Sequence, residues 1–193
     1  MRRLSVVACA WLLCAACSEP PQKEIDRAQG ALDAARAAGA DTYAAQELKA
    51  ATDALQQSHD AVAQRDYRLA LSRALDANER ALEAAKQAAD GKARARSEAE
   101  GALAAATAGL KQLHTRLAAA TAARVPPKEL QSARRAEVTV QAALQEARAA
   151  IKNGDYLVGK ERLNGVTEQV SAEIRGIDEA AAARTAKPVR RRR

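Results

Sequence analysis

Aromatic residues are nearly absent from this 193-residue chain, which has no Phe, one Trp and three Tyr. Platforms that stack nucleic-acid bases and the walls of typical ligand pockets both need several such rings. β-Branched residues are also sparse and never alternate with polar residues over a useful length, so no segment predicts a strand. The composition therefore predicts an all-α protein and argues against an enzyme with a shielded pocket.

Cysteine is confined to the start of the chain, at Cys9, Cys14 and Cys17. The rest of the sequence therefore has no disulfide, no thiolate nucleophile and no cysteine metal site. The two histidines, His59 and His114, each lack a second histidine at the helical spacing of a metal site. We expect no metal, no cofactor and no catalytic residue.

The apolar stretch Leu4–Leu13 is well short of the roughly 20 residues that cross a bilayer as a helix. It follows Met1-Arg2-Arg3 and precedes Ala15-Ala16, an arrangement typical of an export signal. Residues 1–16 are therefore predicted to be a signal peptide that directs export of the mature protein.

The end of this leader, residues 13–18, has the sequence Leu-Cys-Ala-Ala-Cys-Ser and resembles the bacterial lipobox. It departs from that pattern at Cys14, where Leu is usual. The resemblance implies that Cys17 is lipidated and anchors the chain in a membrane. The residue after Cys17 is Ser18 and not Asp, which resembles the sorting signal of lipoproteins sent on to the outer membrane. The alternative is ordinary cleavage after Ala16, which would leave a soluble periplasmic protein with a free thiol.

The formal charge of +7 is carried by the two ends of the chain. Without Arg2, Arg3 and the basic residues of segment 187–193, the chain has 24 basic and 24 acidic side chains. The basic pI is therefore no evidence for nucleic-acid binding. Segment 187–193 is predicted to be a disordered tail that binds anionic lipid, lipopolysaccharide or peptidoglycan, or else serves only solubility. Its basic residues are Lys187, Arg190, Arg191, Arg192 and Arg193.

A single long helix over residues 66–122 is the main architectural prediction. No proline interrupts it, and apolar residues recur along it at intervals of seven, which indicates a seam that packs against other helices. Charged residues replace large apolar ones over residues 90–96, which we interpret as a junction between two packed units. The seam residues are Leu75, Leu82, Ala89, Leu103, Leu110 and Leu117, with Leu71, Ala85, Ala99, Ala106, Leu113 and Ala120 beside them.

Turn signals divide the remaining chain into four further helices. Gly39 is expected to end the first helix, Asp66 to cap the long one, and Asn153-Gly154-Asp155 to separate the last two, while Pro127 is expected to begin the fourth. Glu-Leu and Asp-Tyr pairs recur in both halves, which indicates a tandem repeat. We predict an elongated antiparallel bundle of five helices in two three-helix units, 23–90 and 91–186, preceded by a linker at 17–22.

The segments 38–48 and 65–70, which hold small-residue turns and an Asp-Tyr pair, resemble an uncharacterised family of alanine-rich bacterial lipoproteins. That family is known as a domain of unknown function. The resemblance implies an envelope protein and supplies no catalytic residue. The small murein lipoprotein type is a weaker match, because its attachment chemistry uses a terminal lysine and this chain ends in four arginines.

Three functions remain to be distinguished. The first is a non-enzymatic lipoprotein, facing the periplasm from the outer membrane, that acts as a helical spacer or adaptor. Its partners would be the membrane through Cys17 and peptidoglycan, anionic lipid or another envelope protein. The second is a chaperone-type module that binds proteins or amphiphiles in its grooves. An enzyme is the third, and it would require a buried pocket with convergent polar groups.

Overall fold

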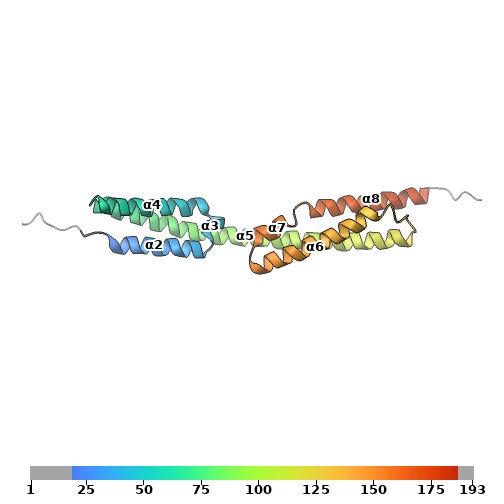
Figure 1. Cartoon of the computed structure of the whole chain (residues 1–193), viewed down its shortest axis with the longest axis horizontal. Coiled ribbons are helices and arrows are strands. Elements are labelled where there is room, and N and C mark those ends of the chain that lie inside the picture. The colour runs from blue at the N-terminus through green and yellow to red at the C-terminus, as the bar shows by residue number, and fades with distance from the viewer. Residues whose placement is uncertain (1–18, 187–193) are drawn as a thin grey trace, which may run out of the picture. The chain divides into compact units, whose positions relative to one another are not determined.

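The structure is a computed structural model that describes residues 19–186 (Figure 1). Within this range every regular element is an α-helix, and no strand occurs. The predicted all-α class is confirmed. Contacts between residues divide the chain into two compact units, the first ending at Gly91 and the second beginning at Lys92. None of the described helices combines the length and the hydropathy that a membrane span requires.

Unit 1 is a bundle of three helices with a short fourth helix in a connection (Figure 1). It contains α2 (Gln22–Ala37), α3 (Ala40–Tyr43), α4 (Ala45–Ala63) and the first part of α5 (Tyr67–Ala122). Its core combines a few large side chains with many alanines, which allow the helix backbones to approach closely. The large core residues are Ile25, Leu32, Leu48 and Leu55.

The turns of unit 1 follow local signals in the sequence. Gly39, just past the end of α2, has a φ of 92°, a left-handed conformation that glycine adopts at low cost. Asp66 precedes α5, and its Oδ1 accepts a hydrogen bond from the backbone N–H of Leu69 at 3.0 Å. The predicted cap of the long helix is confirmed, because this bond satisfies one of the backbone donors left free at a helix start.

Unit 2 continues α5 from Lys92 and adds α6 (Gln131–Asn153), α7 (Tyr156–Glu161) and α8 (Val166–Ala186). α5 is uninterrupted from Tyr67 to Ala122, so the polar segment 90–96 is helical. The core of unit 2 has larger side chains than that of unit 1. It includes Leu113, Leu117, Leu130, Val140, Leu144, Val170 and Ile177.

The predicted fifth helix is two helices in the structure, α7 and α8, so the prediction of five helices was incorrect. Gly165 has a φ of 72° in the turn that separates them, and this left-handed conformation interrupts a helix. Gly159 in α7 lies so close to α6 that an added Cβ would be 2.7 Å from Ile151 Cγ1. Glycine therefore allows α7 to pack closely against α6, because only a residue without a side chain fits at position 159.

Two other boundaries differ from the prediction. A turn was expected at residues 40–42, after Gly39, but residues 40–43 form the short helix α3. α6 begins at Gln131 and not at Pro127, because residues 127–130 form tight turns in which the Leu130 N–H bonds to the Pro127 carbonyl at 3.3 Å. The N–H of Glu129 bonds to the Pro126 carbonyl at 2.9 Å. These turn bonds satisfy backbone groups before the regular helix starts.

Candidate functional site

The residues predicted to carry function at the two ends lie outside the described part of the chain. These are the lipidation residue Cys17 and the basic tail residues Lys187, Arg190, Arg191, Arg192 and Arg193. The residues between them were predicted to be a neutral helical body. We therefore sought candidate sites on the surfaces of the two helical units.

In unit 1, α5 buries a stripe of alanines and leaves leucines outside. The buried stripe follows a spacing of four and three residues and packs with the cores of α2 and α4. Leu71, Leu75 and Leu82, predicted to lie in the packed seam, are instead 38%, 48% and 58% exposed. This part of the seam prediction was wrong. The buried alanines are Ala70, Ala74, Ala77, Ala81, Ala84 and Ala88.

The physical reason is the close packing of three helices in unit 1. Six alanines at this spacing form a narrow flat face, which lets α2 and α4 approach the α5 backbone. The leucines occupy an adjacent stripe, and in a three-helix unit no further helix covers it. In unit 2 the seam is buried as predicted at Leu113 and Leu117, where the partner helices present larger residues.

Three of the four exposed leucines of α5 form one line, which we call the leucine row; the fourth, Leu69, is 42% exposed and lies on another side of the helix. Leu75 follows Leu71 by four residues and Leu82 follows Leu75 by seven, so all three lie on one face of the helix. The row extends about 16 Å at the helical rise per residue. Its first member, Leu71, lines a hollow of about 590 Å³ together with residues 19–24. The row therefore begins beside the segment that follows Ser18.

Acidic side chains predominate beside the leucine row. Glu79 is four residues after Leu75, and Glu83 lies one turn further along the same side of α5. Asp90 follows at the end of the unit. Two basic residues lie beside the same row, Arg68 three residues before Leu71 and Lys86 four residues after Leu82. Glu79 and Asp90 have no ion-pair partner among the described residues, whereas Glu83 accepts a hydrogen bond from the amide of Gln87 at 3.1 Å.

The two units have opposite formal charges. Residues 19–91 contain nine basic and 13 acidic side chains, a balance of −4, and residues 92–186 contain 15 basic and 11 acidic side chains, a balance of +4. The neutral body predicted from the whole sequence is therefore the sum of an acidic unit and a basic one. The same count, made separately on either side of the predicted junction at residues 90–96, would have found this separation.

Ion pairs between the helices of unit 2 lie on its surface. Lys160 Nζ donates to Glu98 Oε2 at 2.7 Å, which joins α7 to α5, and this hydrogen bond lowers the pKa of Glu98. Glu100 on α5 accepts a hydrogen bond from Arg96 Nε at 2.8 Å, and that bond raises the pKa of Arg96. These charges are solvated and contribute little to folding. Lys160 and Arg96 are therefore paired with acidic side chains.

Both histidines lie at the surface of their helices. His114 Nδ1 is 2.7 Å from Glu137 Oε1, which connects α5 to α6, and His59 is exposed on α4. Across residues 19–186, no group of three or more His, Cys, Asp or Glu side chains has the geometry to hold a metal ion. His114 and Glu137 instead line an open groove.

Two hollows flank α5 in unit 2, and each combines apolar and basic side chains. The first, about 690 Å³, lies between α5 and α6, where Leu117, Ala118 and Val138 lie beside Arg134. The second, about 450 Å³, lies between α5 and α8 and is lined by Ile174, Lys111 and Arg116. Both are open to solvent. Each groove is lined by both apolar and basic side chains, and the first also by Glu137.

The leucine row and the grooves were missed by the sequence interpretation. The signal for the row was present, because the alanines at 70–88 repeat as regularly as the leucines. Periodicity alone does not show which of two adjacent stripes is buried. The stripe with the larger residues was therefore assigned to the core. The grooves form between neighbouring helices, and periodicity within one helix does not predict which helices are neighbours.

Comparison of the chain with protein-family models, with curated proteins and with solved structures finds no match.

Proposed function

We propose that this chain is a non-enzymatic lipoprotein of the bacterial cell envelope, anchored in the outer membrane through lipid on Cys17 and facing the periplasm. It acts as a helical spacer and adaptor between that membrane and a second component. The lipobox-like residues 13–18 support the anchor, and the resemblance of segments 38–48 and 65–70 to alanine-rich lipoproteins supports the envelope location.

The leucine row is the observation that carries the adaptor role. Three exposed leucines lie on one helix face of a unit whose formal charge is −4. An exposed row of this kind marks a surface that another element covers. Helical spacing of four and seven residues fits a second helix laid along α5, which would complete a four-helix bundle.

The charge of unit 1 indicates which side chains the second helix would carry. Unit 1 has a balance of −4, and Glu79, Glu83 and Asp90 follow the leucine row on one side. The occupant is therefore an amphipathic helix of another envelope protein, with an apolar stripe about 16 Å long and basic residues beside it. A second copy of unit 1 would bring the same acidic side chains together, which opposes pairing.

A synthetic helical peptide tests this docking surface. The probe has leucines at positions i, i+4 and i+11 with lysines beside them, and its matched control has glutamates in place of the lysines. The test protein is residues 17–193 with Cys17→Ser, expressed without residues 1–16, and peptide binding to it is followed by fluorescence anisotropy. We expect at least tenfold tighter binding of the lysine peptide at low salt, with a loss of the preference at high salt.

Two variants distinguish binding at the leucine row from nonspecific hydrophobic binding. Leu75→Ala with Leu82→Ala is expected to weaken binding of the lysine peptide about tenfold or more, since each truncated contact removes apolar burial. Leu157→Ala removes an exposed leucine from unit 2 and is expected to have no effect. Equal loss in both variants, or equal binding of the two peptides, would refute the docking surface. Concentration-dependent dimerisation that the double variant abolishes would assign the row to a second copy.

The membrane anchor has a separate test. Metabolic labelling with a fatty acid is expected to mark the wild-type chain and not the Cys17→Ser variant, whose precursor should remain uncleaved. An unlabelled wild-type chain in the soluble fraction would overturn the lipoprotein assignment and leave the docking test unaffected.

A chaperone-type module that binds amphiphiles is the second candidate function. The two open grooves of unit 2 favour it, because each presents apolar side chains next to basic ones. Such grooves suit a molecule with an apolar part and an anionic group.

A further inference from the structure

A second set of basic side chains lies on described residues, separate from the C-terminal tail. It lies at the end of unit 2 where the chain turns from α5 to α6, and we call it the basic end. None of its five members makes an ion pair with a described residue. The members are Arg124, Lys128, Arg134, Arg135 and Arg184.

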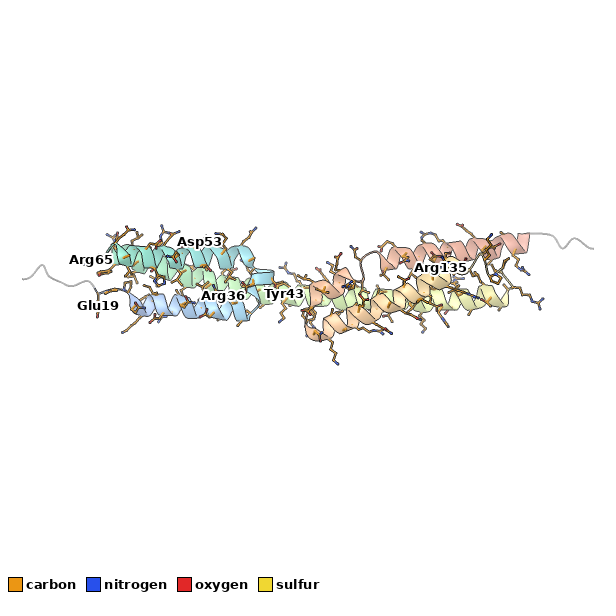
Figure 2. All side chains as sticks on the ribbon, in the orientation of Figure 1. Glu19, Arg36, Tyr43, Asp53, Arg65 and Arg135 are labelled. Carbon is orange, nitrogen blue, oxygen red and sulfur yellow. The ribbon has the colours of Figure 1, made fainter. Side chains whose placement is uncertain are left out.

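The fold of unit 2 brings these residues to one end. α6 returns along α5 after the turn at residues 123–130, and α8 runs in the direction of α5, so its last turns reach the same end (Figure 1). An ion pair between Arg116 of α5 and Asp178 of α8, at 3.5 Å, joins the two helices near this end. Arg134 and Arg135 open α6, where Figure 2 labels Arg135.

Few acidic side chains compensate for this charge. Glu137 and Asp178 lie nearby, but Glu137 contacts His114 and Asp178 contacts Arg116. Glu129 and Glu179 are the acids of this region that have no ion-pair partner among described residues. With histidine counted as neutral, Glu137 adds a third negative charge that no basic residue cancels. Five positive charges without an ion-pair partner therefore face three negative ones, and an excess of one sign over a small surface attracts anions.

Apolar side chains lie within the same surface. Val138 is 67% exposed, one helical turn after Arg134, and both line the groove between α5 and α6. On the other side of α5, Ile174 lies in the groove that Lys111 and Arg116 also line. The tyrosines among the described residues, Tyr43, Tyr67 and Tyr156, belong to none of these linings, so aromatic stacking on bases or sugars is not available there.

We infer that the basic end of unit 2 binds the phosphate headgroups of an anionic lipid surface, with Val138 and the neighbouring groove floor in contact with the apolar layer beneath. The inference deepens the proposed envelope function by naming the surface that unit 2 meets. Lys and Arg side chains supply the electrostatic attraction to such a surface, and exposed apolar residues add contact with the acyl boundary.

Vesicle binding tests this inference on a chain that lacks both other attachment points. The protein is the mature Cys17→Ser form ending at Ala186, so neither lipid nor tail contributes. Vesicles of phosphatidylglycerol and phosphatidylethanolamine are compared with vesicles of phosphatidylcholine by cosedimentation at low salt. We expect binding to the anionic vesicles only, and its loss at high salt. Failure of the lipoprotein assignment would leave this result unchanged.

Matched charge variants locate the site. The test variant is Lys128→Gln with Arg134→Gln and Arg135→Gln, which spares Arg124 because its positive φ of 57° belongs to the turn. Each basic residue near an anionic surface contributes roughly fivefold to binding, so the variant is expected to bind on the order of 100-fold more weakly. The control, Lys92→Gln with Arg94→Gln and Lys152→Gln, also removes three charges from unit 2 and is expected to weaken binding much less.

The source of the phosphate is distinguished by further probes. Val138→Ser is expected to weaken vesicle binding several-fold and to leave binding of soluble polyphosphate unchanged, because polyphosphate has no apolar part. Equal losses in the two charge variants would show a general charge effect and overturn the site. Binding of peptidoglycan or DNA as strong as that of anionic vesicles, with no effect of Val138→Ser, would assign the basic end to a polymer and overturn the lipid surface.

Discussion

The hydroxyl of Ser58 on α4 donates a hydrogen bond of 2.8 Å to the backbone carbonyl of Ala70 on α5. Ser58 is fully buried, and the bond joins two helices at the end of unit 1 where the chain turns through residues 64–66. A buried hydroxyl is tolerated because it has this partner. The pair also lies at the start of the alanine stripe that determines which face of α5 is covered.

Loss of this hydroxyl should destabilise unit 1 modestly. Ser58→Ala is expected to lower the free energy of unfolding by about 1 kcal/mol, the typical net value of a hydrogen bond. Ser72→Ala, an exposed serine on α5, is the matched control and is expected to change stability by less than about 0.5 kcal/mol. Urea unfolding followed by circular dichroism measures both, and equal effects would show that the Ser58 bond contributes nothing.

Neighbouring residues on α5 should respond in opposite ways to a change of size. Ala81 is fully buried in the stripe, so Ala81→Leu is expected to overpack unit 1 and destabilise it by about 1–3 kcal/mol. Leu82→Ala, at a position that is mostly exposed, is expected to cost less than about 1 kcal/mol. Chemical denaturation distinguishes the two, and the reverse ranking would mean that the leucine row faces the core.

Two helical glycines of unit 2 offer a matched pair of alanine substitutions. Gly176 of α8 has open space where an added Cβ would lie, so Gly176→Ala is expected to stabilise by about 0.5–1 kcal/mol through helix propensity. Gly159→Ala would place its methyl group 2.7 Å from Ile151 Cγ1 and 3.3 Å from the Ala147 carbonyl oxygen. We expect a loss of about 1–3 kcal/mol.

A second substitution distinguishes steric contact from other causes at Gly159. Ile151→Ala removes the closest atom, so the Gly159→Ala change should cost less in that background than in the wild type. Thermal unfolding of the four proteins gives the coupling. Additive losses would show that Ile151 is not the obstacle and that the contact with the α6 backbone dominates.

The pH response of Glu98 should depend on Lys160. The Lys160 hydrogen bond lowers the pKa of Glu98, so the favourable interaction is present above the ordinary carboxylate range and is lost as pH falls through the lowered pKa. Lys160→Gln is expected to move the pKa of Glu98 upward, and Lys152→Gln is expected to leave it unchanged. Carbon-detected NMR titration measures the shift, which should shrink in high salt because the pair is exposed.

Helix positions were predictable because their signals are local. Asp66 caps α5 through its own side chain, and Gly39 and Gly154 adopt the positive φ that their turns require. The Asn153-Gly154-Asp155 signal likewise predicted the turn at which α6 ends. These features depend on neighbours within a few residues, so the chain itself specifies them.

The sequence alone determined the all-α class, the long helix and its cap, since composition, spacing and turn residues act locally. Tertiary structure decided which stripe of α5 is buried, because Ala74 and Leu75 lie on adjacent faces and only the approach of α2 and α4 selects the alanines. It also placed Gly159 against α6 and brought Arg184 of α8 to the same end as the basic residues of segment 124–135. Both depend on helix neighbours, and helical periodicity carries no information about which neighbour a face will meet.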